Sequence, residues 1–97
     1  MLNLTARELQ IVKDILVQYA PTYPVWVFGS RVTGSNKQFS DLDLAIISDE
    51  AVPVETFAKL REAFSESDLT FKVDLIDWTT IDKSFQKIIL THHEILQ

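Results

Sequence analysis

The chain reads Val25-Trp26-Val27-Phe28-Gly29-Ser30 and, after ten further residues, Asp41-Leu42-Asp43-Leu44-Ala45-Ile46-Ile47. Both stretches hold runs of β-branched, aromatic and other apolar residues, and such runs bounded by turn residues predict two central strands. The segment between them contains both glycines of the chain together with Ser, Asn and Thr. This composition predicts a loop, with room for one helical turn after Ser30.

Helical patterns flank these strands. Thr5-Ala-Arg-Glu8 is a capping-box sequence, and apolar residues follow at three- and four-residue steps as far as Tyr19. A second helical face runs from Val54 to Phe64, residues Lys72–Asp77 form a third strand pattern, and a last helix is predicted from about Ile81 through His92. The order of elements predicts an α+β fold in which helices flank a small sheet.

Length and composition predict one ordinary globular domain, residues 1–97. The 97 residues are 46% hydrophobic and 24% charged, which is far from the composition of disordered chains. There is no cysteine, which excludes disulfide frameworks and thiolate zinc sites. Neither a signal-peptide pattern nor a membrane-length apolar stretch is present, so we expect a cytoplasmic protein that does not associate with a membrane.

The charge balance disfavours one class of partner. Nine basic residues stand against fourteen acidic ones, for a formal net charge of −5. Proteins that bind long nucleic acids gather Lys and Arg against the phosphates, so we expect no long nucleic acid as a partner. If the chain handles phosphate groups, a metal ion bound to its acids is the expected source of positive charge.

Three acids fall on two of the predicted strands. Asp41 and Asp43 are two residues apart, which places both side chains on one face at a separation of roughly 6.5–7 Å along the strand. Two like charges about 7 Å apart repel by about 2.4 kcal/mol at an effective dielectric constant near 20, and a divalent cation would relieve this repulsion. Asp74 lies in the third predicted strand and joins them if that strand neighbours the second. Otherwise the pair is a solvated strand end and Asp74 an edge residue.

The Gly29-Ser30 turn is a candidate phosphate cradle. A glycine directly after a strand lets the backbone approach a ligand closely, and Ser30 offers a hydroxyl where a helix N-terminus would aim its amides at an anion. A plain tight turn with Ser30 as a helix cap is the alternative.

Together these residues resemble the DNA polymerase β-like nucleotidyltransferases, in the small branch called minimal nucleotidyltransferases (MNT). Gly-Ser, ten residues and Asp-x-Asp form the signature of that family, and the chain has Gly29-Ser30 followed after ten residues by Asp41-Leu42-Asp43. Gly34 falls on the second glycine of the family. Thr33 departs from the pattern, since many members carry Arg there. The resemblance implies the mixed-sheet fold of the family.

The resemblance also implies a mechanism in which carboxylates hold two divalent metal ions, expected to be Mg²⁺. Asp41 and Asp43 would bind the metals, one of which also carries a nucleoside triphosphate, expected to be ATP. Asp74 would bind the other metal and help to deprotonate an acceptor hydroxyl. Gly29 and Ser30 would hold the terminal phosphates. The products would be a nucleoside monophosphate ester and pyrophosphate.

Three further loop residues enter the implied nucleotide site. Ser40 belongs to the matching Ser-Asp-x-Asp sequence and is expected to contact the nucleotide. Arg31, with Lys37 beside it in the loop, would add positive charge near the phosphates. For Arg31 and Lys37 the alternative is a solvated loop residue.

The identity of the acceptor follows from what the chain lacks. Its length leaves no room for a domain that grips an acceptor, so the acceptor must bring its own binding surface. Minimal members of the family resemble antitoxins that transfer AMP to a tyrosine of a helical HEPN toxin, which makes such a toxin the expected partner. A non-catalytic module that binds its partner by contact alone, and transfer to a small molecule such as an aminoglycoside, are the alternatives. A homo-oligomer is compatible with the sequence.

The remaining aromatic and imidazole residues are expected to pack. Neighbouring residues on a helix point about 100° apart, so His92 and His93 are not predicted to share a metal. We expect His92 to be half-buried on the apolar face of the last helix. Trp78 is predicted to pack at the rim of the sheet, with stacking on a nucleobase as the alternative, and Trp26 to lie in the core or an interface.

Overall fold

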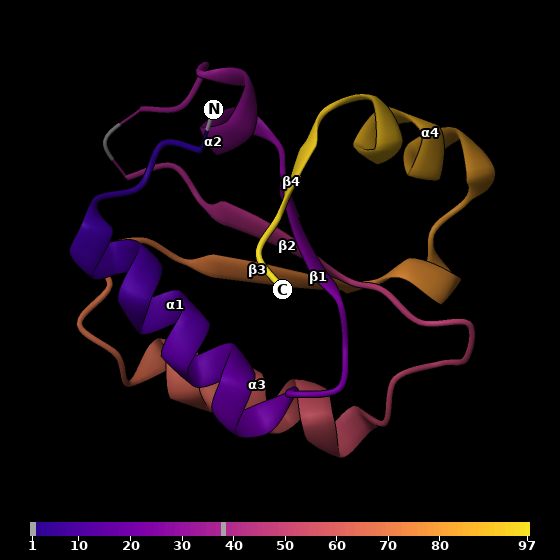
Figure 1. Cartoon of the computed structure of the whole chain (residues 1–97), viewed down its shortest axis with the longest axis horizontal. Coiled ribbons are helices and arrows are strands. Elements are labelled where there is room, and N and C mark those ends of the chain that lie inside the picture. Colours follow the sequence, from indigo (N-terminus) through magenta and orange to yellow (C-terminus); the bar gives the residue numbers. More distant parts are fainter. Residues whose placement is uncertain (1, 38) are drawn as a thin grey trace.

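A four-stranded sheet with the strand order β3-β2-β1-β4 organises residues 2–37 and 39–97, which the computed structural model describes. Figure 1 shows helices α1 and α3 together on one side of these strands and α4 on the other. The elements in chain order are α1 (Ala6–Tyr19), β1 (Val25–Phe28), α2 (Ser30–Thr33), β2 (Leu42–Ile46), α3 (Val54–Ser65), β3 (Val73–Asp77), the 3₁₀ helix η1 (Trp78–Thr80), α4 (Lys83–Thr91) and β4 (His93–Ile95).

The sheet is mixed. Strand β1 lies in the middle and pairs antiparallel with β2 on one side and β4 on the other. Strands β2 and β3 are parallel, and α3 makes the crossover that parallel neighbours require. The prediction of an α+β fold with a small mixed sheet is therefore confirmed, as are the central positions of β1 and β2.

The predicted capping box begins α1. The Thr5 hydroxyl accepts a hydrogen bond from the Glu8 amide at 3.1 Å, and the Glu8 carboxylate accepts one from the Thr5 amide at 2.8 Å. These two bonds satisfy amide groups that a helix start otherwise leaves without partners. The helix then ends at Tyr19, just before Pro21, as its sequence predicts.

Alternation along the strands separates two apolar layers. The larger core lies between the sheet and the helices α1 and α3. Its fully buried members include Val12, Leu16, Val25, Val27, Leu42, Leu44, Ile46 and Leu60. On the opposite face, Phe28 and Ala45 pack with Ile89 of α4. Because successive strand residues face opposite ways, Asp43 shares this second face with Ala45.

The end of the chain differs from its prediction. The last helix begins at Lys83 and ends at Thr91, and residues 93–95 form a fourth strand that pairs with β1. His92 follows the helix as its C-terminal cap and is exposed, so its predicted half-buried position on an apolar helix face is wrong. The physical reason is tertiary, because the central strand β1 gains hydrogen-bond partners along its second edge when the chain turns into β4.

Both tryptophans pack beneath α4. The Trp26 and Trp78 rings meet edge to face with their centroids 5.4 Å apart, and the His93 ring stacks on Trp26 at 4.3 Å. The predicted packing roles of the two tryptophans are therefore confirmed. No helix in the described part of the chain combines the length and apolar character needed to cross a membrane.

Candidate functional site

The β2–β3 register places two of the predicted acids side by side. Asp43 lies directly opposite Asp74 in the parallel pair. Neighbouring strands are about 4.8 Å apart, and residues in register point to the same face, so both carboxylates leave the sheet side by side. Asp41 comes immediately before β2 and is exposed, as is Asp74, whereas Asp43 is half-buried. Strand β3 therefore does neighbour β2, which is the condition under which the sequence joins Asp74 to the other two acids.

Gly29 forms the third side of this acidic site. Phe28 at the end of β1 pairs with Asp43, so the next residue, Gly29, lies beside the Asp43 side chain. Its φ of 82° is in the region that favours glycine, and a Cβ built at this position would collide with Oδ2 of Asp43. The site therefore requires glycine for two separate reasons, which are the backbone conformation and the close approach of a carboxylate.

The ionised form of Asp43 is destabilised by its position in the site. Burial, followed by repulsion from Asp74 and Asp41, raises the pKa of Asp43 from 3.8 to about 6. A carboxyl group with this pKa is ionised at pH 7 but is destabilised by its surroundings. A bound cation would supply a counter-charge, which would lower the pKa of Asp43 and stabilise its ionised form.

The loop before Asp41 is held by Arg31 and Ser40. Arg31 is only 4% exposed, and its guanidinium donates hydrogen bonds of 3.0 Å to the carbonyl oxygens of Ser40 and Asn3. The same group lies 4.0 Å from the centre of the Phe71 ring. Ser40 in turn accepts a bond of 2.8 Å from the Lys37 amide through its hydroxyl. Both residues therefore make contacts that fix the loop, whereas Lys37 is exposed.

The sequence singled out no role for Asp77, yet this acid organises the far end of β3. It is 8% exposed, and its carboxylate accepts hydrogen bonds from Val52 N at 2.9 Å and from the Thr79 amide and hydroxyl at 2.9 and 2.7 Å. Burial raises the pKa of Asp77, but the bonds from Val52 and Thr79 outweigh it and leave the pKa below 3.8. An Asp two residues before Thr at a strand end is the helix-cap signal that could have revealed it.

The donor set fits a divalent cation that shares its ligands with a substrate. Among residues 2–37 and 39–97 no group of three or more His, Asp or Glu side chains is arranged so that the chain alone could hold a metal ion. Mg²⁺ commonly takes one or two carboxylates and fills its remaining positions with water and substrate phosphates. Asp43, with a raised pKa and two further carboxylates near it, would supply oxygen ligands to such a shared site.

The fold and the site together define a nucleotidyltransferase. The chain belongs to the polymerase beta nucleotidyltransferase family, whose sequence model, described as "Polymerase beta, Nucleotidyltransferase", matches residues 10–97. A relative from Haemophilus influenzae, named "Probable protein adenylyltransferase MntA", is 51% identical over 96 residues, which are 99% of this chain and 84% of the relative.

Solved structures of low sequence identity share the fold. A crystal structure of a toxin-antitoxin with AMP-PNP matches with a TM-score of 0.75 at 21% identity, over 92% of this chain and 72% of that one. A rebuilt structure of a tri-AMPylated Shewanella oneidensis HEPN toxin in complex with MNT antitoxin matches with a TM-score of 0.63 at 19% identity, over 92% of this chain and 71% of that one.

Proposed function

We propose that this chain is a protein adenylyltransferase that transfers AMP from ATP to a hydroxyl group of a helical HEPN toxin and so acts as its MNT antitoxin. The observation that carries the proposal is the placement of Asp43 opposite Asp74 and against Gly29, with the charge of Asp41 also acting on Asp43. The 51% identity to a relative named as a protein adenylyltransferase supports the same activity, and the toxin-antitoxin complexes of the same fold support the partner.

The acids are assigned to the metal and the acceptor. Asp41 and Asp43 would hold the ion that carries the triphosphate, and Asp74 a second ion, with Mg²⁺ proposed for both. When bound, these ions neutralise negative charge that develops on the phosphoryl oxygens. The half-buried position of Asp43 supports its assignment as the central ligand, because it is the carboxylate that gains most from a cation.

The chain's own groups position the phosphates and move the proton. Gly29 lets the main chain approach the terminal phosphates, and the Ser30 hydroxyl donates to a phosphate oxygen. The Asp74 carboxylate accepts the proton of the acceptor hydroxyl. The acceptor oxygen then forms a bond to the α-phosphorus while the bond from that phosphorus to the bridging oxygen breaks, and pyrophosphate leaves.

Arg31 and Ser40 receive a positioning role in this proposal, in place of the direct nucleotide contact that the family resemblance implies. The guanidinium of Arg31 is engaged with two carbonyl oxygens and the Phe71 ring, and Ser40 is engaged with the turn at Lys37. These contacts set the path of the chain into Asp41. We further propose that residues 1–97 act as one domain and work in the cytoplasm, where ATP is supplied.

A label-transfer experiment tests the function. The purified chain is incubated with α-labelled ATP, Mg²⁺ and the product of its neighbouring gene, and the label is located by mass spectrometry. We expect AMP on a tyrosine of the partner with the wild-type chain and none with Asp41→Asn. Tight binding and neutralisation of the partner without any label, for every nucleotide, would instead identify a non-catalytic binding module.

A further inference from the structure

A cavity of about 500 Å³ lies beside the edge strand β3, against the end of α3 and the segment that joins the two. Its lining includes Arg61, Phe64, Leu69, Phe71, Lys72 and Asp74. The volume is within the range of about 300–1,000 Å³ that is typical of ligand sites. Asp74 lines this cavity and also lies opposite Asp43, so strand β3 is common to the cavity and the acidic site.

The strand order places this cavity on the acceptor side of the site. Gly29, the proposed phosphate position, follows β1, Asp43 lies on β2 and Asp74 on β3. Moving across the sheet from β1 through β2 to β3 therefore leads from the phosphates to the proposed proton acceptor. In an in-line displacement the attacking oxygen enters opposite the leaving pyrophosphate, which is the side of β3. Beyond β3 the sheet ends, and the cavity begins.

The chemistry of the lining differs from that of the chain as a whole. The protein has a net charge of −5, yet two of its nine basic residues, Arg61 and Lys72, line this cavity, and both are exposed. Two aromatic residues lie behind them, since Phe64 is 6% and Phe71 8% exposed. Exposed cations over an apolar floor suit a peptide segment that combines acidic side chains with an aromatic or apolar one.

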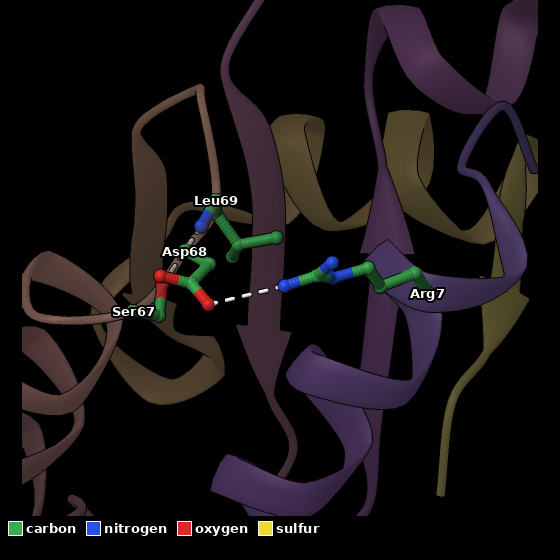
Figure 2. Close-up of polar contacts among 4 residues, drawn as sticks. All are labelled: Arg7, Ser67, Asp68 and Leu69. Carbon is green, nitrogen blue, oxygen red and sulfur yellow. Dashed lines mark hydrogen bonds and ion pairs between the residues drawn. The ribbon is translucent and has the colours of Figure 1, made fainter.

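One wall of the cavity is held in place without a ligand. Figure 2 shows Arg7 of α1 reaching Asp68 at 3.1 Å, in the segment between α3 and β3. In the same segment the Ser67 hydroxyl donates to the Phe64 carbonyl oxygen at 2.6 Å and accepts from the Leu69 amide at 3.3 Å. Leu69 lines the cavity, so the two Ser67 bonds hold the segment that carries this wall, whereas the Arg7–Asp68 ion pair is exposed and adds little.

We infer that this cavity binds the acceptor segment of the partner protein, and that the segment carries acidic side chains next to the hydroxyl that receives AMP. The inference rests on the proposed function. The segment lies along the open edge of β3, its acidic groups contact Arg61 and Lys72, and its hydroxyl reaches Asp74. A basic segment would instead be repelled by both cations.

Charge reversal at the cavity tests the inference. The double variant Arg61→Glu/Lys72→Glu is compared with Lys59→Glu/Lys83→Glu, which makes the same change in net charge at exposed lysines outside the cavity lining. Steady-state AMP transfer to the partner and calorimetric ATP binding are measured for both. We expect the KM for the partner to rise about tenfold or more in the cavity variant and to stay within about twofold in the control. ATP affinity should not change in either.

The possible failures are distinguishable. If the wild-type chain transfers AMP and the cavity variant keeps the wild-type KM, the inference is wrong and the proposed function stands. If the wild-type chain transfers no AMP to any protein, both are wrong. An equal loss of ATP affinity in the cavity variant would assign the cavity to the nucleotide and overturn the inference. Rescue of the cavity variant by a partner with Lys in place of the acidic residues would support it most strongly.

Discussion

Asp43 both destabilises the folded chain and is the proposed central ligand of the metal. Its carboxylate is half-buried on β2 between Asp41 and Asp74, with Gly29 against it, and its pKa of about 6 reflects the burial and the repulsion. Such a placement destabilises the chain when no cation is bound. It also creates the affinity for a cation on which the proposed reaction depends.

Replacing Asp43 with Asn should stabilise the metal-free chain at neutral pH. Because the pKa of Asp43 is raised, the folded chain binds this proton more tightly than the unfolded chain does. Its contribution to stability is therefore largest below pH 3.8 and is lost as the pH rises through about 6. We expect Asp43→Asn to exceed the wild type in free energy of unfolding by more at pH 7 than at pH 4, measured by urea denaturation in a chelator.

A matched variant separates this effect from general charge removal. Asp14→Asn also removes one acid, but at an exposed position of α1. Its stability should follow that of the wild type across the same pH range to within about 0.5 kcal/mol. Equal pH profiles for Asp43→Asn and Asp14→Asn would show that Asp43 is not strained in the folded chain.

The two glycines provide a second comparison. Gly29 and Gly34 have nearly the same φ, 82° and 84°, but a Cβ would collide with Asp43 at Gly29 and meet nothing within 4 Å at Gly34. Gly34→Ala should cost only the conformational strain, about 1–2 kcal/mol. Gly29→Ala should cost more and should also abolish ATP binding, as measured by denaturation and calorimetry. Equal effects of the two changes would make the turn purely structural.

At the scale of elements, Asp77 connects the end of β3 to the segment between β2 and α3. Its bond from Val52 joins β3 to the segment before the crossover helix, and its bonds from Thr79 cap the 3₁₀ helix that follows β3. The alignment of Asp74 with Asp43 depends on the pairing of β3 with β2. Asp77 thus supports the site from the opposite end of the same strand.

Asp77→Asn should destabilise the chain by about 1–3 kcal/mol at pH 7, because an amide group replaces an acceptor surrounded by three donors. The pKa of Asp77 is lowered, so its contribution is present above pH 3.8 and is lost as the pH falls through the lowered value. The difference from the wild type should therefore shrink in acid. Asp49→Asn, an exposed change in the same connection, should have little effect, and a similar loss in both variants would contradict the assignment.

The longer elements could be predicted because each carries its own pattern. The capping box and apolar spacing of α1, and the apolar runs of β1, β2 and β3, are local signals that the fold obeys. Strand β4 could not be predicted, since its three residues have no strand pattern and become a strand only by pairing with β1. The local pattern predicts a helix only as far as His92 and no element for these three residues.

The candidate site, too, could be predicted only where a local sequence pattern indicates it. The spacing of Gly29, Asp41 and Asp43 is written in the sequence, and Asp74 needed only the neighbouring position of β3. The direction of the Arg31 side chain could not be predicted, because its guanidinium meets carbonyl oxygens and an aromatic ring from three distant parts of the chain. Contacts of this kind depend on the finished fold.

At the scale of the whole molecule, the acidic site and the two apolar clusters occupy different parts of one sheet. The large core lies under α1 and α3, and the tryptophan cluster lies under α4. The acids lie on the α4 face at the start of β2 and β3, next to the edge where the acceptor cavity begins. The candidate nucleotide site thus lies beside one flank where the proposed acceptor would dock and complete the reaction geometry.

The isolated chain should therefore be nearly inert toward small alcohols. Proximity and orientation of the acceptor hydroxyl come from the docked partner, and in well-oriented reactions this contribution reaches about 7–11 kcal/mol of the barrier. Incubation with labelled ATP, Mg²⁺ and an aminoglycoside should yield no labelled product, whereas the partner is labelled. Efficient labelling of the small molecule by the chain alone would overturn the partner argument.

Calorimetric titration of Mg-ATP at pH 7 into the wild type, Asp43→Asn and Asp14→Asn tests the central claim most directly, namely that the acids beside Gly29 form a metal and nucleotide site. The account predicts saturable binding by the wild type and by Asp14→Asn, and no measurable binding by a folded Asp43→Asn. Wild-type affinity in folded Asp43→Asn would contradict the account, because the carboxylate at the centre of the site would then take no part in holding the metal or the nucleotide.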